Sequence, residues 1–353
     1  MTIEKNRQEI DRLDAQILDL LNRRAKAALE IGKAKQKQAA DAFVPWRERQ
    51  VLERLAKRNK GPLSDAAVLS IYRQIIAASR QLLGPTKVAY FGPQGTFTHI
   101  AALQKFGELA DLRPIDSIAD VFAEVEKGNA DYAVVPMENS TEGVIRPTLD
   151  MFVESSLSIC AEIYLDIAEY LLSNSPFEQI TRIYSMPQPF AQCRTWIKTN
   201  LPRAELVEVA STAKAAQIAA KEPGAAAIGT DLAARLYKLK IVREHIEDTS
   251  SNRTRFLVIG QAESRPSGKD KTSIMFSVKH QAGALYRTLA VLDKYDINMT
   301  MIESRPTRQK PWEYIFFVDF LGHQDEPRVA KALEHLREGS LFLRVLGSYP
   351  EAE

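Results

Sequence analysis

The first 37 residues hold the feature that most restricts the fold, an uninterrupted helical pattern that is long for a small domain. From Ile3 to Ala34, apolar residues recur every three or four positions, and the stretch contains no Pro and a single Gly. At 1.5 Å per residue, a helix over residues 3–37 would be about 50 Å long. A helix of that length has no core of its own, so we expect it to pack against a second copy of the chain.

Two shorter helices are expected at residues 46–60 and 63–83. The segment 1–84 would then be a thin three-helix domain, which also favours a homodimer or a higher homo-oligomer. It contains 17 Lys and Arg against 10 Asp and Glu, whereas the whole 353-residue chain has a net charge of only +2. This local excess suits a small anionic substrate. No basic block with interleaved aromatic residues is present, which argues against nucleic acid as a partner.

The rest of the chain reads as two further domains. Residues 86–265 alternate short apolar runs with helical patterns, which is typical of an α/β domain with largely parallel sheets, in one piece or two lobes. The polar stretch Gln261–Lys271 contains Pro266 and Gly268 and is expected to be a linker. Residues 270–350 read strand-helix-strand-strand-helix-strand, which is the α+β ferredoxin-like order.

Several functional classes are disfavoured by the composition. Two cysteines, Cys160 and Cys193, are too few for a disulfide framework and fit a reducing compartment. The charged N-terminal residues do not form a secretory signal, and no run of 18 apolar residues predicts a membrane span. The five scattered histidines lack the spacing of metal ligands. We therefore expect a cytoplasmic protein with no metal and no cofactor.

A cation interrupts the apolar seam of the first helix. Position 24 falls on this seam but is Arg24, and an unpaired buried guanidinium is so costly that it needs a carboxylate from the protein or a ligand. Lys35 shares this face about 16 Å away, while Arg7 lies about 25 Å back. Arg7 could reach the same small ligand only from an antiparallel partner chain. Ordinary solvated surface charge is the alternative explanation.

The wider pattern of cations resembles the all-helical chorismate mutase family, over Arg7-x-x-Ile10-x-x-Leu13-Asp14, Leu20-Leu21-Asn22-Arg23-Arg24, Ile31-Gly32-Lys33-Ala34-Lys35 and Arg47-Glu48-Arg49. This family forms intertwined dimers of three-helix chains. The resemblance implies that the carboxylates of chorismate are held by Arg24 and Arg47 of one chain and Arg7 of the other. It implies further that Lys35 binds the ether oxygen, where charge develops, and that the hydroxyl and far end of the substrate are bound by Glu48 and Ser79.

Leu83 departs from this family pattern. Gln or Glu is common at the corresponding position, near the ether oxygen, and Gln81 lies about 200° out of phase on a helix. Reduced mutase activity is therefore expected. A degenerate mutase-like domain that only dimerises, in front of a monofunctional dehydratase, is the alternative.

Residues 87–260 carry a second set of motifs, each weak by itself. Gly92–Thr96 follows an apolar strand and opens a helix, Pro136–Gly143 ends another strand, and Thr254–Phe256 opens a third. Free amides at a helix start favour an anion, and polar clusters at strand ends favour a binding crevice. A plain turn, a helix cap and a β-forming residue explain the same residues equally simply.

Taken together, these motifs resemble prephenate dehydratase along the whole segment, over Ala89–His99, Val135–Ser140, Tyr184–Cys193, Ser211–Ala213 and Asn252–Phe256. The resemblance implies two α/β lobes, similar to periplasmic binding proteins, with the site in a cleft. It implies that Thr254 is the central catalytic residue and that Arg255 forms an ion pair, with the substrate or within the protein. It also implies a set of residues around prephenate: Thr96, Asn139, Ser140, Ser185, Gln192, Ser211, Thr212 and Phe256.

Two motifs in the last segment indicate a regulatory site. Gly283-Ala284-Leu285 opens a helix and Glu303-Ser304-Arg305-Pro306 ends a strand; alone they would be a turn and a surface ion pair. In their ferredoxin-like frame they resemble the ACT domain of phenylalanine-sensitive dehydratases, which implies that L-phenylalanine binds near both motifs. The sequence thus predicts that chorismate is converted to prephenate and prephenate to phenylpyruvate, under feedback inhibition. A non-enzymatic solute-binding sensor is the alternative from another class.

Overall fold

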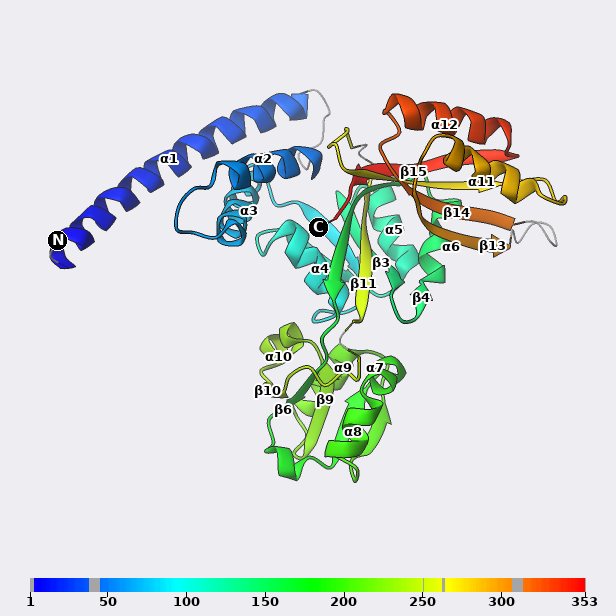
Figure 1. Ribbon diagram of the computed structural model, residues 1–353. Helices are drawn as coiled ribbons and strands as arrows, with labels where there is room; N and C mark the ends of the chain where they lie inside the picture. The colour runs from blue at the N-terminus through cyan, green and yellow to red at the C-terminus, as the bar shows by residue number, and fades with distance from the viewer. Residues whose placement is uncertain (1–2, 38–44, 250, 262–263, 307–313, 353) are drawn as a thin grey trace. The chain divides into compact units, whose positions relative to one another are not determined.

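The computed structural model describes residues 3–37, 45–249, 251–261, 264–306 and 314–352. These residues form two compact units (Figure 1): a helical unit, which runs to Thr86 and includes Phe106–Asp111, and a second unit made of the remainder. Within these ranges, no helix is both long and apolar enough to cross a membrane. The same ranges contain no group of His, Cys, Asp and Glu side chains placed to hold a metal ion.

The helical unit consists of α1 (Ile3–Lys37), α2 (Pro45–Arg58) and α3 (Asp65–Gln81). Ser64 caps α3 by accepting a hydrogen bond from an amide of its first turn. Helix α1 has the length that its apolar spacing predicts, yet Ile10 is 55% exposed and Ile17 is 52% exposed. The apolar face of α1 is thus largely uncovered by the rest of its own chain.

The second unit begins with sheet A, whose strand order is β2-β1-β3-β11-β5, with β4 paired to β3. Helices α5 and α6 bury their apolar faces in the same core as this sheet. The elements are β1 (Lys87–Phe91), α4 (Phe97–Phe106), β2 (Asp111–Ile115), α5 (Ile118–Glu126), β3 (Tyr132–Asn139), β4 (Gly143–Val144), α6 (Arg146–Glu154), β5 (Ser158–Asp166) and β11 (Arg253–Gly260).

Sheet B has the order β10-β6-β9-β7-β8 and is inserted in the chain between β5 and β11 of sheet A. Two clusters of buried residues lie around its strands and helices. Its elements are β6 (Tyr170–Ser173), the 3-10 helix η1 (Phe177–Gln179), β7 (Arg182–Ser185), α7 (Pro187–Gln192), α8 (Arg194–Asn200), β8 (Glu205–Glu208), α9 (Thr212–Ala219), β9 (Ala225–Gly229), α10 (Asp231–Tyr237) and β10 (Lys240–Arg243).

Both sheets are mixed, so the expectation of largely parallel sheets is wrong. β1 and β3 are parallel, but β11 runs antiparallel to both β3 and β5. Two adjacent strands can run parallel only if the chain crosses back to the end of the sheet at which the first strand began. β11 instead re-enters sheet A beside the point where β5 leaves it, since Arg253 pairs with Asp166, and it therefore runs the opposite way.

The helical pattern over Pro189–Thr199 belongs to two helices, α7 and α8. Cys193 lies between them with φ −111° and ψ 14°, which ends α7. The carboxylate of Asp248 then accepts hydrogen bonds from the amides of Thr195 and Trp196 at 2.8 and 2.9 Å. A side chain from a distant segment thus caps the new helix start, and local periodicity cannot reveal it.

Sheet C is fully antiparallel, in the order β13-β14-β12-β15, and confirms the predicted ferredoxin-like fold. One face packs on two helices, and the other adds Met275, Phe317 and Tyr349 to the core of sheet A. Lys271, expected in a linker, is buried in a strand. The elements are β12 (Asp270–Ser277), α11 (Ala284–Lys294), β13 (Met299–Pro306), β14 (Tyr314–Leu321), α12 (Pro327–Glu338) and β15 (Phe342–Pro350).

Candidate functional sites

The first candidate site is the end of the β3–β11 ladder, where Thr254 pairs with Asn139. Asn139 Nδ2 donates to Thr254 Oγ1 at 2.8 Å and to Asn252 Oδ1 at 2.7 Å. The side-chain oxygen of Asn139 accepts from the amide and hydroxyl of Thr141, at 2.9 and 2.5 Å, and from the Glu142 amide at 3.2 Å. These donors fix the orientation of the Asn139 amide, so its NH₂ group faces Thr254.

The hydroxyl of Thr254 is prepared to act as a donor. The side chain belongs to a residue that is only 7% exposed, and its oxygen already accepts the hydrogen bond from Asn139. Among the residues that the structure describes, this hydroxyl donates to none. A buried donor whose position is fixed by a neighbouring amide can stabilise charge on a substrate oxygen without reorganising.

In the described part of the chain, none of the other predicted dehydratase residues bonds the Thr254 side chain. Ser140 bonds the Arg253 backbone in both directions, at 2.8 and 2.9 Å, and so ties β3 to β11. The side-chain amide of Gln192 donates a hydrogen bond to the carboxylate of Glu142, at 3.4 Å. The remaining hydroxyls and ring have local roles: Ser185 donates to a carbonyl of β9, Ser211 caps α9, Thr212 begins that helix, and Phe256 is buried in β11.

The predicted glycine-rich turn after β1 is bound to α10. Gly95 has φ +91°, and a Cβ atom there would lie 3.2 Å from the Ala233 side chain. The Gly95 carbonyl accepts a 2.7 Å hydrogen bond from Thr230. Thr96 is engaged within the turn, since its hydroxyl donates to a carbonyl at 3.1 Å and accepts from the His99 amide at 3.3 Å. Thr230 was not predicted, although its position between an apolar strand and Asp231 is a helix-capping signal.

Tyr90 and His99 stack beneath this turn, with ring centroids 4.7 Å apart. Burial, assisted by Tyr237, raises the pKa of Tyr90, and burial lowers the pKa of His99. His99 is therefore neutral at physiological pH, and its Nδ1 accepts a hydrogen bond from the Gly95 amide at 3.1 Å. This stack supports the backbone of the turn.

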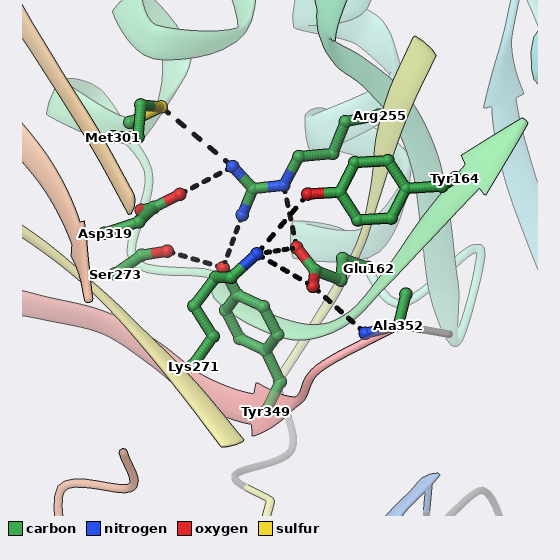
Figure 2. A network of polar contacts seen from close by, with 9 residues as sticks. All are labelled: Glu162, Tyr164, Arg255, Lys271, Ser273, Met301, Asp319, Tyr349 and Ala352. Atoms are coloured by element: carbon green, nitrogen blue, oxygen red, sulfur yellow. Dashed lines mark hydrogen bonds and ion pairs between the residues drawn. The ribbon is translucent and has the colours of Figure 1, made fainter. Parts of the chain in front are cut away.

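Arg255 follows Thr254 in the chain but belongs to a different cluster, which is shown in Figure 2. Its guanidinium donates to Glu162 at 2.8 Å, to Asp319 at 2.6 Å and to the Tyr349 hydroxyl at 2.8 Å. Burial alone would lower the pKa of Arg255, but Tyr349, Asp319 and Glu162 together hold it well above its ordinary value. The ion pair expected for Arg255 is therefore made within the protein, and this geometry does not favour a contact with substrate.

Lys271 completes the buried polar network around Arg255. Its Nζ lies 3.0 and 2.9 Å from the two oxygens of Glu162 and 3.4 Å from the Tyr164 hydroxyl. The hydroxyls of Ser273 and Tyr349 are 2.6 Å apart. Two cations and two carboxylates thus meet between sheets A and C, and the neutral hydroxyls satisfy the remaining donors.

The second candidate site lies in the helical unit, where Arg24 on α1 meets Ser79 on α3. Arg24 Nη1 donates to Ser79 Oγ at 2.7 Å, and Ser79 in turn donates to the Ile75 carbonyl at 2.7 Å. A cavity of about 170 Å³ adjoins this contact. It is lined by Arg24, Ala28, Ile31, Gly32, Ile76, Ser79, Arg80 and Leu83.

Arg80 lines the same cavity, although its role was not predicted. It lies 3.5 Å from the carboxylate of Glu48, and both side chains are largely buried. The sequence does indicate that Arg80 shares a helix face with Ser79, because Ile76, Ser79, Arg80 and Leu83 follow the i, i+3, i+4, i+7 pattern.

Two other predicted mutase residues, Arg7 and Arg47, are not among the described residues that line this cavity. Arg47 is exposed and bonds Gln50. Arg7 has a 72% exposed side chain and lies 3.9 Å from Glu4. The Lys35 side chain lies outside the described part of the structure.

Leu83 fills space that Gly32 leaves open. A Cβ atom on Gly32 would lie 2.0 Å from Leu83 Cδ1, so any larger residue at position 32 would displace this side chain. Gln81 is exposed, as its helical phase predicts. An apolar side chain therefore lines the cavity at the position where the resemblance leads one to expect an amide or a carboxyl.

The two predicted effector motifs both lie in the domain of sheet C. Gly283 has φ +72° and precedes α11, a left-handed conformation that favours glycine. Ala284 is buried at the first turn of α11 and Leu285 is half-buried. On β13, Arg305 donates to both oxygens of Asp150 on α6, at 2.5 and 2.7 Å, while Glu303 is half-buried and Ser304 and Pro306 are exposed. Arg305 thus links β13 to the dehydratase segment.

Three family models match the chain in succession: chorismate mutase type II over residues 6–83, prephenate dehydratase over 88–264 and the ACT domain over 272–338. The bifunctional chorismate mutase/prephenate dehydratase of Aquifex aeolicus is 49% identical over 355 residues, covering 99% of this chain and 98% of that protein. The protein of the same description from Escherichia coli is 34% identical and covers 98% and 95%.

Solved structures agree with this assignment. The prephenate dehydratase from Arthrobacter aurescens, determined in complex with L-Phe, is 34% identical, with a TM-score of 0.70, over 75% of this chain and 89% of that one. Full-length identity to enzymes with both activities disfavours the non-enzymatic sensor and the purely dimerising front domain. The chain belongs to the family of bifunctional chorismate mutase/prephenate dehydratases with an ACT domain.

Proposed function

We propose that Thr254, held by Asn139, is the centre at which this enzyme dehydrates and decarboxylates prephenate. The reaction breaks the C–C bond to the ring carboxylate, and its electrons complete the aromatic ring as the ring hydroxyl departs. A hydroxyl donor at the departing oxygen stabilises the developing charge and helps it to leave as water. The buried 2.8 Å contact between Asn139 and Thr254 carries this proposal, because it leaves the Thr254 hydrogen available to the substrate.

The lining of the dehydratase site remains a proposal. We place Ser140, Ser185, Gln192, Ser211 and Thr212 around prephenate, with Thr96 and Phe256 shaping the site. The support is their position beside the Asn139–Thr254 pair or at the strand ends and helix starts of sheet B. Arg255 is left out of this set, because its guanidinium is fully engaged by protein groups.

For the mutase reaction we propose a site completed by a second copy of the chain. Arg24, Arg47, Glu48 and Ser79 would come from one subunit and Arg7 of the partner subunit from the other, with Lys35 at the ether oxygen. The exposed apolar face of α1 supports this arrangement, since it needs a partner to become buried. The rearrangement needs no nucleophile, so binding a reactive conformer and placing positive charge at the breaking C–O bond are sufficient.

We further propose that the chain is divided at residues 1–84, 86–265 and 270–350, and that the enzyme acts in the cytoplasm. Separate turnover assays with chorismate and with prephenate test the paired activities directly. A protein that converts chorismate but not prephenate, or the reverse, would contradict the proposal that both centres are intact in this chain.

Leu83→Gln should accelerate the rearrangement of chorismate by about 100- to 1000-fold, because one preorganised donor is worth about that factor. The amide would enter the cavity that Leu83 now lines, where charge develops on the ether oxygen. The measurement is chorismate consumption at matched substrate concentration. Leu82→Gln is the matched control, since Leu82 is 52% exposed and should leave the rate unchanged. A rate for Leu83→Gln equal to that of the wild type would show that another donor already fills this role.

L-phenylalanine should bind the domain of sheet C and inhibit the dehydratase, with a coupling of about 5- to 150-fold between the two sites. The Gly283 and Glu303–Pro306 motifs and the L-Phe complex of the Arthrobacter aurescens relative support this proposal. Calorimetry with L- and D-phenylalanine, followed by prephenate turnover, measures binding and inhibition separately. Gly283→Val should weaken binding, because its backbone has φ +72°. Absence of binding at millimolar L-phenylalanine would refute the proposal.

A further inference from the structure

The two neighbouring residues Thr254 and Arg255 face different parts of the protein. Successive side chains of a strand point to opposite faces of its sheet. On β11, Thr254 turns toward Asn139, and Arg255 turns toward sheet C, where it meets Asp319 on β14 and Tyr349 on β15. A single strand therefore connects the proposed dehydratase centre with the regulatory sheet through consecutive residues.

The contact between Arg255 and sheet C is buried. Arg255 is 4% exposed, Glu162 is 3% and Asp319 is 2%. Because these groups are shielded from bulk solvent, moving Asp319 away from the guanidinium would deprive a buried charge of one of its two carboxylate partners. Sheet C and β11 must therefore shift together, or the network must break.

The effector motif is close to this network in the strand ladder of sheet C. On β13, Glu303 pairs with Phe317, and Met301 pairs with Asp319. The Met301 sulfur also lies 4.0 Å from Arg255 Nη1. The strand that carries Glu303–Pro306 thus reaches the Arg255 network within two residues of the motif, so a change in its position is passed on over a short distance.

β11 is irregular at the point where such a shift would arrive. Its register with β3 changes between Arg255 and Phe256, whereas its register with β5 is continuous there. A bulge leaves a residue outside the regular ladder and allows the strand to bend locally. Thr254 could therefore move relative to Asn139 while β11 stays paired with β5.

We infer that Arg255 is a positioning residue through which sheet C controls the placement of the Thr254 hydroxyl. When an amino-acid effector shifts β13 and β14, Asp319 on β14 carries the guanidinium with it. The Thr254 hydroxyl then leaves the position that its hydrogen bond with Asn139 fixes. This inference rests on the proposed regulation by phenylalanine and names the contact that transmits it.

Asp319→Asn tests the inference, because it keeps the shape of the side chain and removes the charge that holds Arg255. The variant should bind L-phenylalanine with a dissociation constant within about threefold of the wild type, and its uninhibited turnover should be similarly close. Inhibition at saturating phenylalanine should fall at least about tenfold. The decisive readout is linkage: the ratio of phenylalanine dissociation constants with and without phenylpyruvate should fall to about one.

Arg344→Met is the matched control. Arg344 on β15 also joins sheet C to the dehydratase segment, by donating to the Phe152 carbonyl, and among the described residues it has no hydrogen bond to β11. This variant should keep both inhibition and linkage. Tyr349→Phe removes one hydrogen-bond acceptor of the Arg255 guanidinium and should weaken linkage partially. This second variant keeps the test valid if Asp319→Asn folds poorly.

Three outcomes would overturn the inference. Normal inhibition in Asp319→Asn would leave phenylalanine as the effector but exclude Arg255 as the connection. Loss of phenylalanine binding in that variant would place Asp319 in the effector site itself. A wild-type enzyme that binds no phenylalanine would remove the proposed regulation and this inference together.

Discussion

Thr254→Val should lower prephenate turnover by about 100- to 10,000-fold while leaving chorismate rearrangement unchanged. Valine keeps the volume and β-branching of threonine, so the buried position stays filled. It lacks the hydroxyl that would donate to the departing oxygen, and it leaves Asn139 Nδ2 with only its 2.7 Å contact to Asn252. The measurement is phenylpyruvate formation from prephenate, with mutase turnover of the same sample as an internal control.

Thr254→Ser separates the hydroxyl from the shape of the side chain. Serine restores the hydroxyl donor and should therefore recover most of the lost rate. The recovery should be incomplete, because the serine side chain has more rotational freedom than threonine. If Thr254→Val kept more than about a tenth of the wild-type rate, well above the range for lost general acid catalysis, Thr254 would not be the central residue.

Arg24→Ala should lower chorismate rearrangement by at least about 100-fold, and dehydratase turnover should not change. The substitution removes a cation that lines the 170 Å³ cavity and donates to Ser79 at 2.7 Å. A carboxylate held by a fixed guanidinium would lose both its charge partner and its orientation. The assay is chorismate consumption, with prephenate turnover measured on the same preparation.

Arg23→Ala is the matched control for this substitution. Arg23 is the preceding residue of the same helix, its side chain is 72% exposed, and it lies 3.7 Å from Asp19. An exposed pair of this kind contributes little, so mutase activity should remain close to that of the wild type. Equal losses in the two variants would mean that the net charge of α1, and not the site at Arg24, determines the rate.

Local sequence patterns predict a helix or strand correctly where one segment alone determines its structure. The helical patterns over residues 97–106 and 327–338, the second of which opens with Pro327, coincide with α4 and α12, and α1 has its predicted length. Local patterns do not predict β9, because its sequence, Ala-Ala-Ala-Ile-Gly, has helical propensity, and only complete burial between two strands makes it extended. β5 was missed for a similar reason, since a buried Glu162 is stable only beside Arg255 and Lys271 from distant segments.

The site residues could be identified from local motifs, but their contacts depend on distant segments. Thr254 and Asn139 could be identified by their motifs, but their direct contact depends on β11 returning antiparallel beside β3. For Arg255, the residue type indicated an ion pair, yet its partners come from β5 and from two strands of sheet C. No spacing within the dehydratase segment could have named Asp319 or Tyr349.

The insertion of sheet B between β5 and β11 has a consequence for the order in which the enzyme folds. The chain leaves and re-enters sheet A at one point, where the Ile167 amide donates to the Asn252 carbonyl at 2.8 Å. Closing the 167–252 segment as an unstructured loop would cost about 4 kcal/mol of chain entropy. If sheet B folds first, its own contacts bring these ends together, and β11 can then pair with β5 on one side and β3 on the other. During synthesis β11 is also the last strand of sheet A to be made, so Thr254 leaves the ribosome after Asn139 and the rest of that sheet.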